Sequence, residues 1–111
     1  MLVYRITPKI FSTSLFAPGI AGRWNGAGNR VIYAAESIPL AFMENMIRRK
    51  GLGFNNDYAI MIIEIPGTLK ITTIDPSTLA IGWRDFADYS ICQAVGNDWY
   101  DKGLTPVLKV P

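Results

Sequence analysis

Short apolar runs separated by turn residues dominate the hydrophobic pattern of this chain. Five runs have the length and composition of β-strands: Leu2–Ile6, Val31–Ala34, Tyr58–Ile65, Leu69–Ile74 and Pro106–Val110. The run at 58–65 is almost continuously apolar, which predicts a central strand covered on both faces. The turn at Pro66-Gly67 favours a hairpin between the third and fourth strands, although a wider connection is also compatible with the pattern.

The first predicted helix begins at Ser37 and runs to about Lys50, before Gly51. Serine is a good N-cap, a proline in the first turn lacks only an N–H that would be unbonded anyway, and glycine suits the position after a helix. The apolar stripe of this helix comprises Leu40, Met43 and Ile47. Glu44 lies at the border of that stripe, so its carboxylate either extends to solvent at the helix flank or points into a cleft beside the core.

The second predicted helix spans Ser90–Tyr100, where Ile91, Val95 and Trp99 recur near helical spacing. Gly96 weakens it slightly. A short helix is also compatible with residues 79–88. Cys92 lies inside the second helix, and we expect a buried, inert thiol there.

A long loop rich in glycine and proline connects the first two predicted strands, over residues 8–30. Loops of this length in small domains are usually functional or disordered. Trp24, flanked by Arg23 and Asn25, indicates order, because an aromatic side chain of that size is costly to leave in water. The pattern as a whole predicts an α+β fold: a small mixed β-sheet with about two main helices, in a single domain over residues 1–111.

Composition narrows the chemistry. The formal charge is +2 with interspersed acids and bases, which does not indicate a protein that binds nucleic acid or a membrane surface. No apolar run is long enough to span a bilayer, and no secretion signal is present, so we expect a cytoplasmic protein. The chain has one cysteine and no histidine, which excludes His-based nucleophilic catalysis, and we expect neither a bound metal nor a cofactor.

Candidate site residues cluster between the glycine-rich loop and the first helix. Arginine forks match phosphate oxygens, a tyrosine ring offers a stacking face, and a carboxylate stabilises an oxocarbenium ion. Arg5, Arg23, Tyr33 and Glu44 supply these groups. Nicotinamide leaves NAD as a neutral molecule, so cleavage of the nicotinamide–ribose bond needs no acid, and one glutamate without a histidine is compatible with it. The composition permits this chemistry but does not select it. Ordinary core or surface positions for Arg5 and Tyr33 are equally compatible with the pattern.

The order of these motifs resembles the RES-domain toxins of RES–Xre toxin–antitoxin systems. The resemblance rests on Tyr4-Arg5-Ile6, Gly22-Arg23-Trp24-Asn25 with Gly28, Val31-Ile32-Tyr33, Glu36-Ser37, Leu40-Ala41, Glu44, Ala94-x-Gly96-Asn97-x-Trp99 and Pro106–Pro111. It implies a fold similar to that of ADP-ribosyltransferases and a bacterial toxin that degrades NAD in the cytoplasm by hydrolysis or phosphorolysis. NAD would be its substrate.

The same resemblance implies a role for each residue. Glu44 would be the essential carboxylate, with Arg5 and Tyr33 completing the catalytic set. Substrate binding would fall to Arg5 and Tyr33 together with Arg23, Trp24 and Asn25. The implied partner is an Xre-like antitoxin, in a hetero-oligomer or beside a homodimer, with no direct contact to nucleic acid or membrane.

Two other functions fit the same residues: a protein ADP-ribosyltransferase, and a catalytically impaired nucleotide-binding module of RES type. The family pattern usually continues past a Val-Pro pair with a serine and a further apolar strand. Because this chain ends at Pro111, the resemblance predicts a single RES-like domain truncated at its C-terminus.

Overall fold

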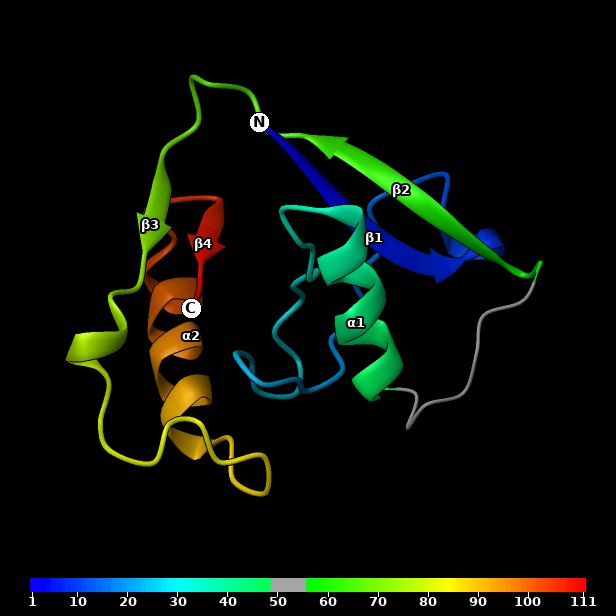
Figure 1. Ribbon diagram of the computed structural model, residues 1–111. Coiled ribbons are helices and arrows are strands. Elements are labelled where there is room, and N and C mark those ends of the chain that lie inside the picture. Colours follow the sequence, from blue (N-terminus) through cyan, green and yellow to red (C-terminus); the bar gives the residue numbers. More distant parts are fainter. Residues whose placement is uncertain (49–55) are drawn as a thin grey trace. The chain divides into compact units, whose positions relative to one another are not determined.

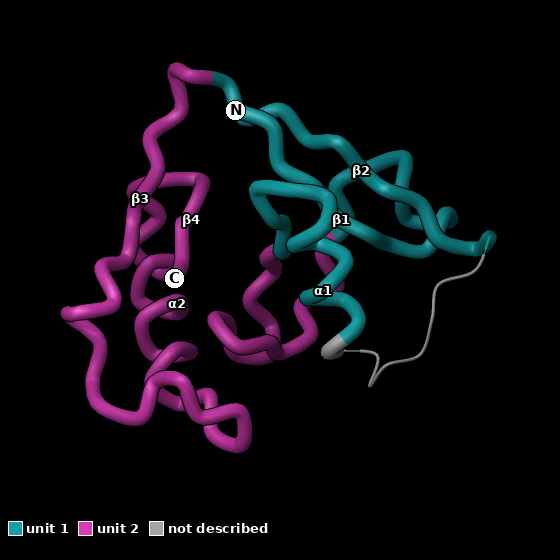
Figure 2. The backbone as a smooth tube through the Cα atoms, in the orientation of Figure 1, with its two compact units in different colours: residues 1–16, 32–66 teal, residues 17–31, 67–111 magenta. Residues whose placement is uncertain are grey.

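The computed structural model describes residues 1–48 and 56–111, and the side chains of Ile47 and Arg48 lie outside the description. Within these residues the chain forms two compact units, residues 1–16 with 32–66 and residues 17–31 with 67–111 (Figure 2). Each unit holds one α-helix and one two-stranded sheet (Figure 1). The predicted α+β class with two main helices is therefore confirmed.

The first unit is built on strand β1 (Leu2–Pro8), which pairs in antiparallel register with β2 (Tyr58–Glu64). The 3-10 turn η1 (Lys9–Phe11) follows β1 directly. On its other edge, β1 forms an isolated bridge, in which the amides and carbonyls of Tyr4 and Ala35 exchange hydrogen bonds of 2.8 Å. Helix α1 (Ile38–Arg48) packs against β1 (Figure 1). Ala41 is the buried residue of this helix among its described side chains.

Ser37 caps α1 as predicted, because its Oγ accepts a hydrogen bond from the amide of Leu40 at 3.2 Å. The predicted apolar stripe is wrong: the side chains of Leu40 and Met43 are 45% and 62% exposed, whereas Ala41 is buried. The small Ala41 side chain allows the helix backbone to approach the sheet closely. The predicted helix end at Lys50 and Gly51, and the third stripe residue, Ile47, lie outside the described residues and side chains.

Strand β2 differs from its prediction as a central strand. In the described part of the chain β1 is its sole strand partner, and the side chains of Ile60 and Ile62 are exposed. The predicted strand at Val31–Ala34 is reduced to the single bridge at Ala35. An apolar run shows which residues favour burial, but the number of partner strands depends on segments distant in sequence.

The second unit contains a parallel pair, β3 (Ile71–Thr73) and β4 (Val107–Lys109), rather than the predicted hairpin of the 58–65 and 69–74 runs. The two runs lie in different sheets of different units, so they form neither a hairpin nor a more widely connected pair. Between the two strands lie the 3-10 turn η2 (Pro76–Thr78), a series of turns where a short helix was considered, and helix α2 (Ser90–Lys102). Gly103 ends α2 with a left-handed φ of 60°.

Thr105 connects α2 to this parallel sheet. Its Oγ1 accepts a hydrogen bond from the indole N–H of Trp99 at 3.0 Å and lies 2.6 Å from the hydroxyl of Thr72. The predicted last strand is confirmed as β4. The hydrogen bonds of Thr105 fix the start of this strand relative to α2. Neither described helix has both the length and the apolar character needed to cross a membrane.

Candidate functional site

Arg5 lies on β1, on the strand face that also carries the buried residues Val3 and Thr7. Strand alternation places it opposite Tyr4 and Ile6, as predicted. Arg5 is half-buried, and its Nη1 donates a hydrogen bond to the carbonyl of Phe16 at 3.3 Å. This contact ties the side chain to the segment that follows β1 and η1.

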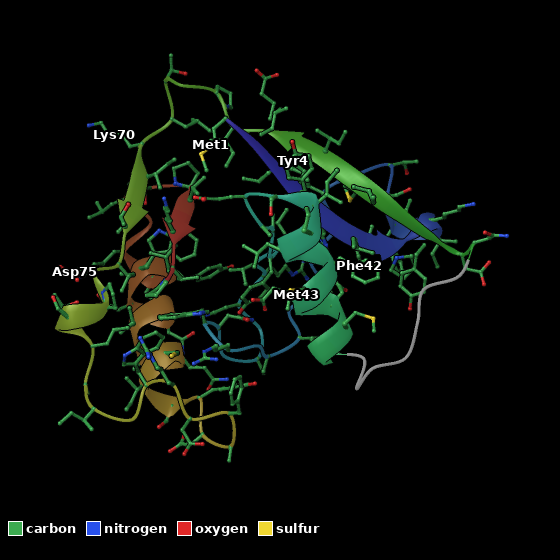
Figure 3. All side chains as sticks on the ribbon, viewed as in Figure 1. Met1, Tyr4, Phe42, Met43, Lys70 and Asp75 are labelled. Atoms are coloured by element: carbon green, nitrogen blue, oxygen red, sulfur yellow. The ribbon has the colours of Figure 1, made fainter. Side chains whose placement is uncertain are left out.

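Tyr33 precedes the Ala35 bridge by two residues and is half-buried. Because the bridge joins Ala35 to Tyr4, the segment that carries Tyr33 lies beside β1. Tyr4, the residue of β1 that forms the bridge with Ala35, is labelled in Figure 3. A tyrosine in this position can offer a ring face or its hydroxyl to a neighbouring molecule.

Glu44 is exposed on α1, three residues after the buried Ala41. Of the two predicted positions for this carboxylate, exposure favours the helix flank. Met43, beside it on the helix, is also exposed (Figure 3). Arg5, Tyr33 and Glu44 therefore come from three neighbouring elements of the first unit: β1, the segment bridged to it and the helix packed on it.

The remaining predicted site residues, Arg23, Trp24 and Asn25, belong to the second unit. Gly22 and Asn25 form a tight bridge, and the amide of Gly28 donates to the carbonyl of Gly19 at 2.9 Å. Gly28 has a φ of 92°, which explains the glycine there. The glycine-rich segment is therefore an ordered loop, as the tryptophan indicated.

Asn25 organises this loop from inside. Its side chain is only 2% exposed, and its Nδ2 donates to the carbonyls of Ile20 and Asn29 at 3.0 and 3.1 Å. Trp24 is buried as well, with its ring 6.4 Å from that of Trp83. Both residues have clear structural roles, and their direct contact with a substrate stays a prediction.

Three residues of α2 hold the loop in place. The Oδ1 of Asn97 accepts hydrogen bonds of 2.8 Å from the amide of Gly26 and from the side chain of Asn29. The side-chain amide of Gln93 donates to the carbonyl of Gly22 at 2.8 Å. Gly96 lies directly against the backbone of Trp24, where a Cβ atom would overlap the carbonyl group. The sequence indicated Gly96 as a weak helix position and, together with Asn97, as part of the motif that resembles RES domains, but it indicated no contact for either residue.

Arg23 lies among three aromatic rings. Its Cζ is 5.7 Å from the ring centroid of Trp83, 5.5 Å from that of Phe86 and 5.6 Å from that of Tyr89. Its Nη2 donates to the carbonyl of Trp83 at 2.9 Å. A guanidinium stacked on aromatic faces in a half-buried position gains cation–π stabilisation of up to about 2 kcal/mol. The aromatic residues at 83, 86 and 89 were not predicted as neighbours of Arg23, because nothing local relates them.

Cys92 is fully buried, and its thiol donates to the carbonyl of Trp83 at 3.2 Å. This agrees with the expected inert thiol. The predicted site residues are therefore divided: Glu44, Arg5 and Tyr33 belong to the first unit, and Arg23 lies among aromatic rings of the second. A carboxylate can stabilise a developing positive charge on a sugar, and a guanidinium can orient its phosphates.

Comparison with known proteins points to one family. The sequence model of the RES domain matches residues 2–111. A protein of Photorhabdus laumondii called Toxin Res is 27% identical over the whole chain, which covers 73% of that protein. A Toxin Res of Pseudomonas putida is also 27% identical, with 75% of its length covered. A Prs ADP-ribosylating toxin of a Sphingobium strain is 28% identical over 81% of this chain and 57% of its own length. The chain described here belongs to the RES domain family.

Proposed function

We propose that this protein is a toxin that consumes NAD by breaking the nicotinamide–ribose bond. Two findings support the proposal: membership of a family with relatives called Toxin Res, and the carboxylate, guanidinium and phenol groups on neighbouring elements of the first unit. The observation that carries it is the match of the RES domain model to residues 2–111. We assign the reaction to Glu44, an exposed carboxylate on the helix that packs against the strand of Arg5, in a chain without histidine.

In the proposed reaction the C–N bond between nicotinamide and ribose breaks with its electron pair leaving on nicotinamide. The positive charge moves to the sugar as an oxocarbenium ion, and Glu44 stabilises that ion electrostatically. Water or inorganic phosphate then attacks the sugar carbon. In the first unit, Arg5 would hold phosphate or ribose oxygens and Tyr33 would line the nicotinamide end. A substrate contact of Arg23, in the second unit, stays a prediction of the family resemblance. No general acid is needed, because nicotinamide leaves as a neutral molecule.

The decisive experiment is to incubate the purified chain with NAD and measure free nicotinamide. Glu44→Gln keeps the size of the side chain but removes its charge, so we expect turnover to fall by at least about a hundredfold. Glu64→Gln is the matched control, since Glu64 is another exposed carboxylate of the same unit. Equal turnover by Glu44→Gln and Glu64→Gln would remove Glu44 from the mechanism. Repeating the assay with and without inorganic phosphate separates phosphorolysis from hydrolysis. Hydrolysis yields ADP-ribose, whereas phosphorolysis yields ADP-ribose with an additional phosphate on the carbon that nicotinamide left.

A second candidate function is ADP-ribosyl transfer to a protein. It is supported by the Sphingobium relative, whose name describes an ADP-ribosylating toxin. A nucleophilic side chain would replace water as the acceptor of the same oxocarbenium ion. Labelled NAD separates the two: label that stays on protein after denaturation indicates transfer, and label in free ADP-ribose indicates hydrolysis. Binding of NAD without either product would instead identify a catalytically impaired nucleotide-binding module.

The toxin role implies a cytoplasmic site of action, where NAD is available, and an antitoxin of Xre type that blocks the site. Induced expression in a bacterial host is the direct measurement. Growth should stop and cellular NAD should fall with the unaltered chain but not with Glu44→Gln. Growth arrest at normal NAD would contradict NAD consumption as the cause.

A further inference from the structure

The edge of β2 that faces away from β1 is open in the described part of the chain. The pairing of Tyr58–Glu64 with Leu2–Pro8 runs without a bulge, and no second strand lies beside β2 in that part (Figure 1). The strand carries neither a proline nor a lysine, and its one charged residue, Glu64, is at its end. Proteins ordinarily protect sheet edges with such residues or with bulges. This edge is therefore suited to pair with another strand.

Hydrogen bonds on the far side of β1 show which backbone groups of β2 face outward. The amide and carbonyl of Tyr4 both bond to Ala35, so they point away from β2. Residues directly opposite each other in an antiparallel pair behave alike, so Ile62, opposite Tyr4, points its amide and carbonyl away from β1. Ile60, two residues earlier, does the same. Among residues 1–48 and 56–111, no backbone group bonds to these outward amides and carbonyls.

The side chains of Ile60 and Ile62 add an apolar surface to the open edge. They are 49% and 64% exposed, and the alternation of the strand places both on one face of the sheet. Leu2 of β1 lies on the same face and is also half exposed. The edge therefore offers directed hydrogen bonds and an apolar surface to the same neighbour, and cross-strand pairs of large aliphatic side chains stabilise a sheet.

We propose that this edge of β2 binds the same edge of a second copy of the chain, in antiparallel register centred on Met61. Ile60 of one copy then lies opposite Ile62 of the other, and their outward amides and carbonyls bond to each other. The apolar pairs and the hydrogen-bonded pairs coincide in this register. Two-fold symmetry also places the two Glu64 carboxylates at opposite ends of the paired strands, whereas parallel pairing would place them side by side.

The neighbouring antiparallel registers fit less well. Centring on Ile62 would place the carboxylate of Glu64 opposite Ile60, and centring on Ile60 would carry Glu64 beyond the end of the other strand. Met61 is the midpoint of β2, so its register alone overlaps the whole strand. One strand pair is small beside the roughly 1,200 Å² buried by stable interfaces, so we expect a weak, concentration-dependent dimer. Pairing uses the open edge of both copies, so assembly stops at two.

Sedimentation equilibrium of the whole chain over a wide concentration range tests the dimer. Ile62→Lys places an unpaired charge between the two strands, so we expect the dissociation constant to rise at least about tenfold. Ile10→Lys is the matched control, because it makes the same change at an 80% exposed position of the same unit and should dimerise normally. Circular dichroism checks that each variant is folded, which the exposure of both positions favours.

A mixture of two variants tests the register. Ile60→Glu and Ile62→Lys should each associate poorly alone, because each places a charge opposite an isoleucine. In a mixed dimer the introduced carboxylate of one chain lies opposite the introduced ammonium group of the other, and the two unaltered isoleucines face each other. We therefore expect mixed dimers at concentrations where neither variant associates by itself.

A chain that stays monomeric at every concentration would overturn the proposal, as would folded Ile62→Lys that associates as tightly as Ile10→Lys. Growth beyond two copies would contradict closed pairing of the edges, and a mixture that stays monomeric would refute the register. These outcomes do not depend on the proposed reaction. NAD cleavage by a chain that never dimerises refutes the dimer alone, whereas a dimer that leaves NAD intact refutes the reaction alone.

Discussion

Gly96 is the residue whose role depends most on its tertiary surroundings. In isolation a glycine inside a helix costs about 1 kcal/mol relative to alanine, so the sequence alone treats this position as a weakness. In the structure it lets the backbone of α2 approach the backbone of Trp24, and the neighbouring Asn97 binds the same loop. The missing side chain is what allows helix and loop to fit together.

Replacing Gly96 with alanine should therefore destabilise the protein despite the better helix propensity of alanine. The new Cβ would lie 2.7 Å from the carbonyl carbon of Trp24, a backbone atom that cannot move aside without displacing the loop. We expect a loss of about 2 kcal/mol or more in the free energy of unfolding, measured by urea denaturation. Gly67→Ala is the control, because nothing lies within 4 Å of the equivalent position. A Gly96→Ala protein as stable as the control would contradict this packing.

Among the secondary-structure elements, local capping was predictable and lateral pairing was not. The Ser37 cap of α1 and the Gly103 end of α2 depend on hydrogen bonds and backbone angles within a few residues. The partner of β3 is β4, more than thirty residues further along the chain, instead of the adjacent β2. A strand pattern specifies which side chains share a face, but several partners fit the same pattern.

Two aspartates cap turns of the second unit and should make its stability depend on pH. A backbone N–H of Ser77 lowers the pKa of Asp75, at the start of η2 (Figure 3), and that of Ser90 lowers the pKa of Asp88 before α2. Because the folded pKa is below the unfolded value of about 3.9, each carboxylate stabilises the fold above that value. This stabilisation is lost as the pH falls through the lower, folded pKa.

Asp88→Asn should consequently be less stable than the unaltered chain at neutral pH, and the difference should shrink as the pH falls below about 4. Urea midpoints measured from pH 7 downwards test this, with Asp75→Asn as a second variant expected to behave alike. A stability difference that stays constant or widens in acid would show that the charge of Asp88 does not contribute to the cap.

For the molecule as a whole, the two compact units are interleaved along the chain. Residues 17–31, from the N-terminal third, belong to the same unit as residues 67–111. Trp24 and Gly26 contact α2, so that helix is completed by a loop that precedes it by more than sixty residues. Neither unit is a continuous stretch of sequence.

A fragment comprising residues 67–111 should therefore fail to form its native packing alone. It lacks the loop that contacts Gly96 and Asn97, as well as Arg23, whose guanidinium lies among the rings of Trp83, Phe86 and Tyr89. Near-ultraviolet circular dichroism, which reports fixed tryptophan environments, should show little signal for the fragment. Addition of a peptide of residues 17–31 should restore part of it. A native-like spectrum from the fragment by itself would contradict this dependence.

The amino-acid sequence by itself determined the α+β class, both main helices, the Ser37 cap, the order of the glycine-rich loop and the resemblance to RES domains. These features depend on residue types and spacings that lie close together in the chain. Tertiary structure alone decided that Asn25 is buried, that Arg23 lies among Trp83, Phe86 and Tyr89, and that β3 pairs with β4. Each of these contacts joins segments distant in sequence, and such contacts form only when the packing of the whole chain selects them from many compatible local patterns.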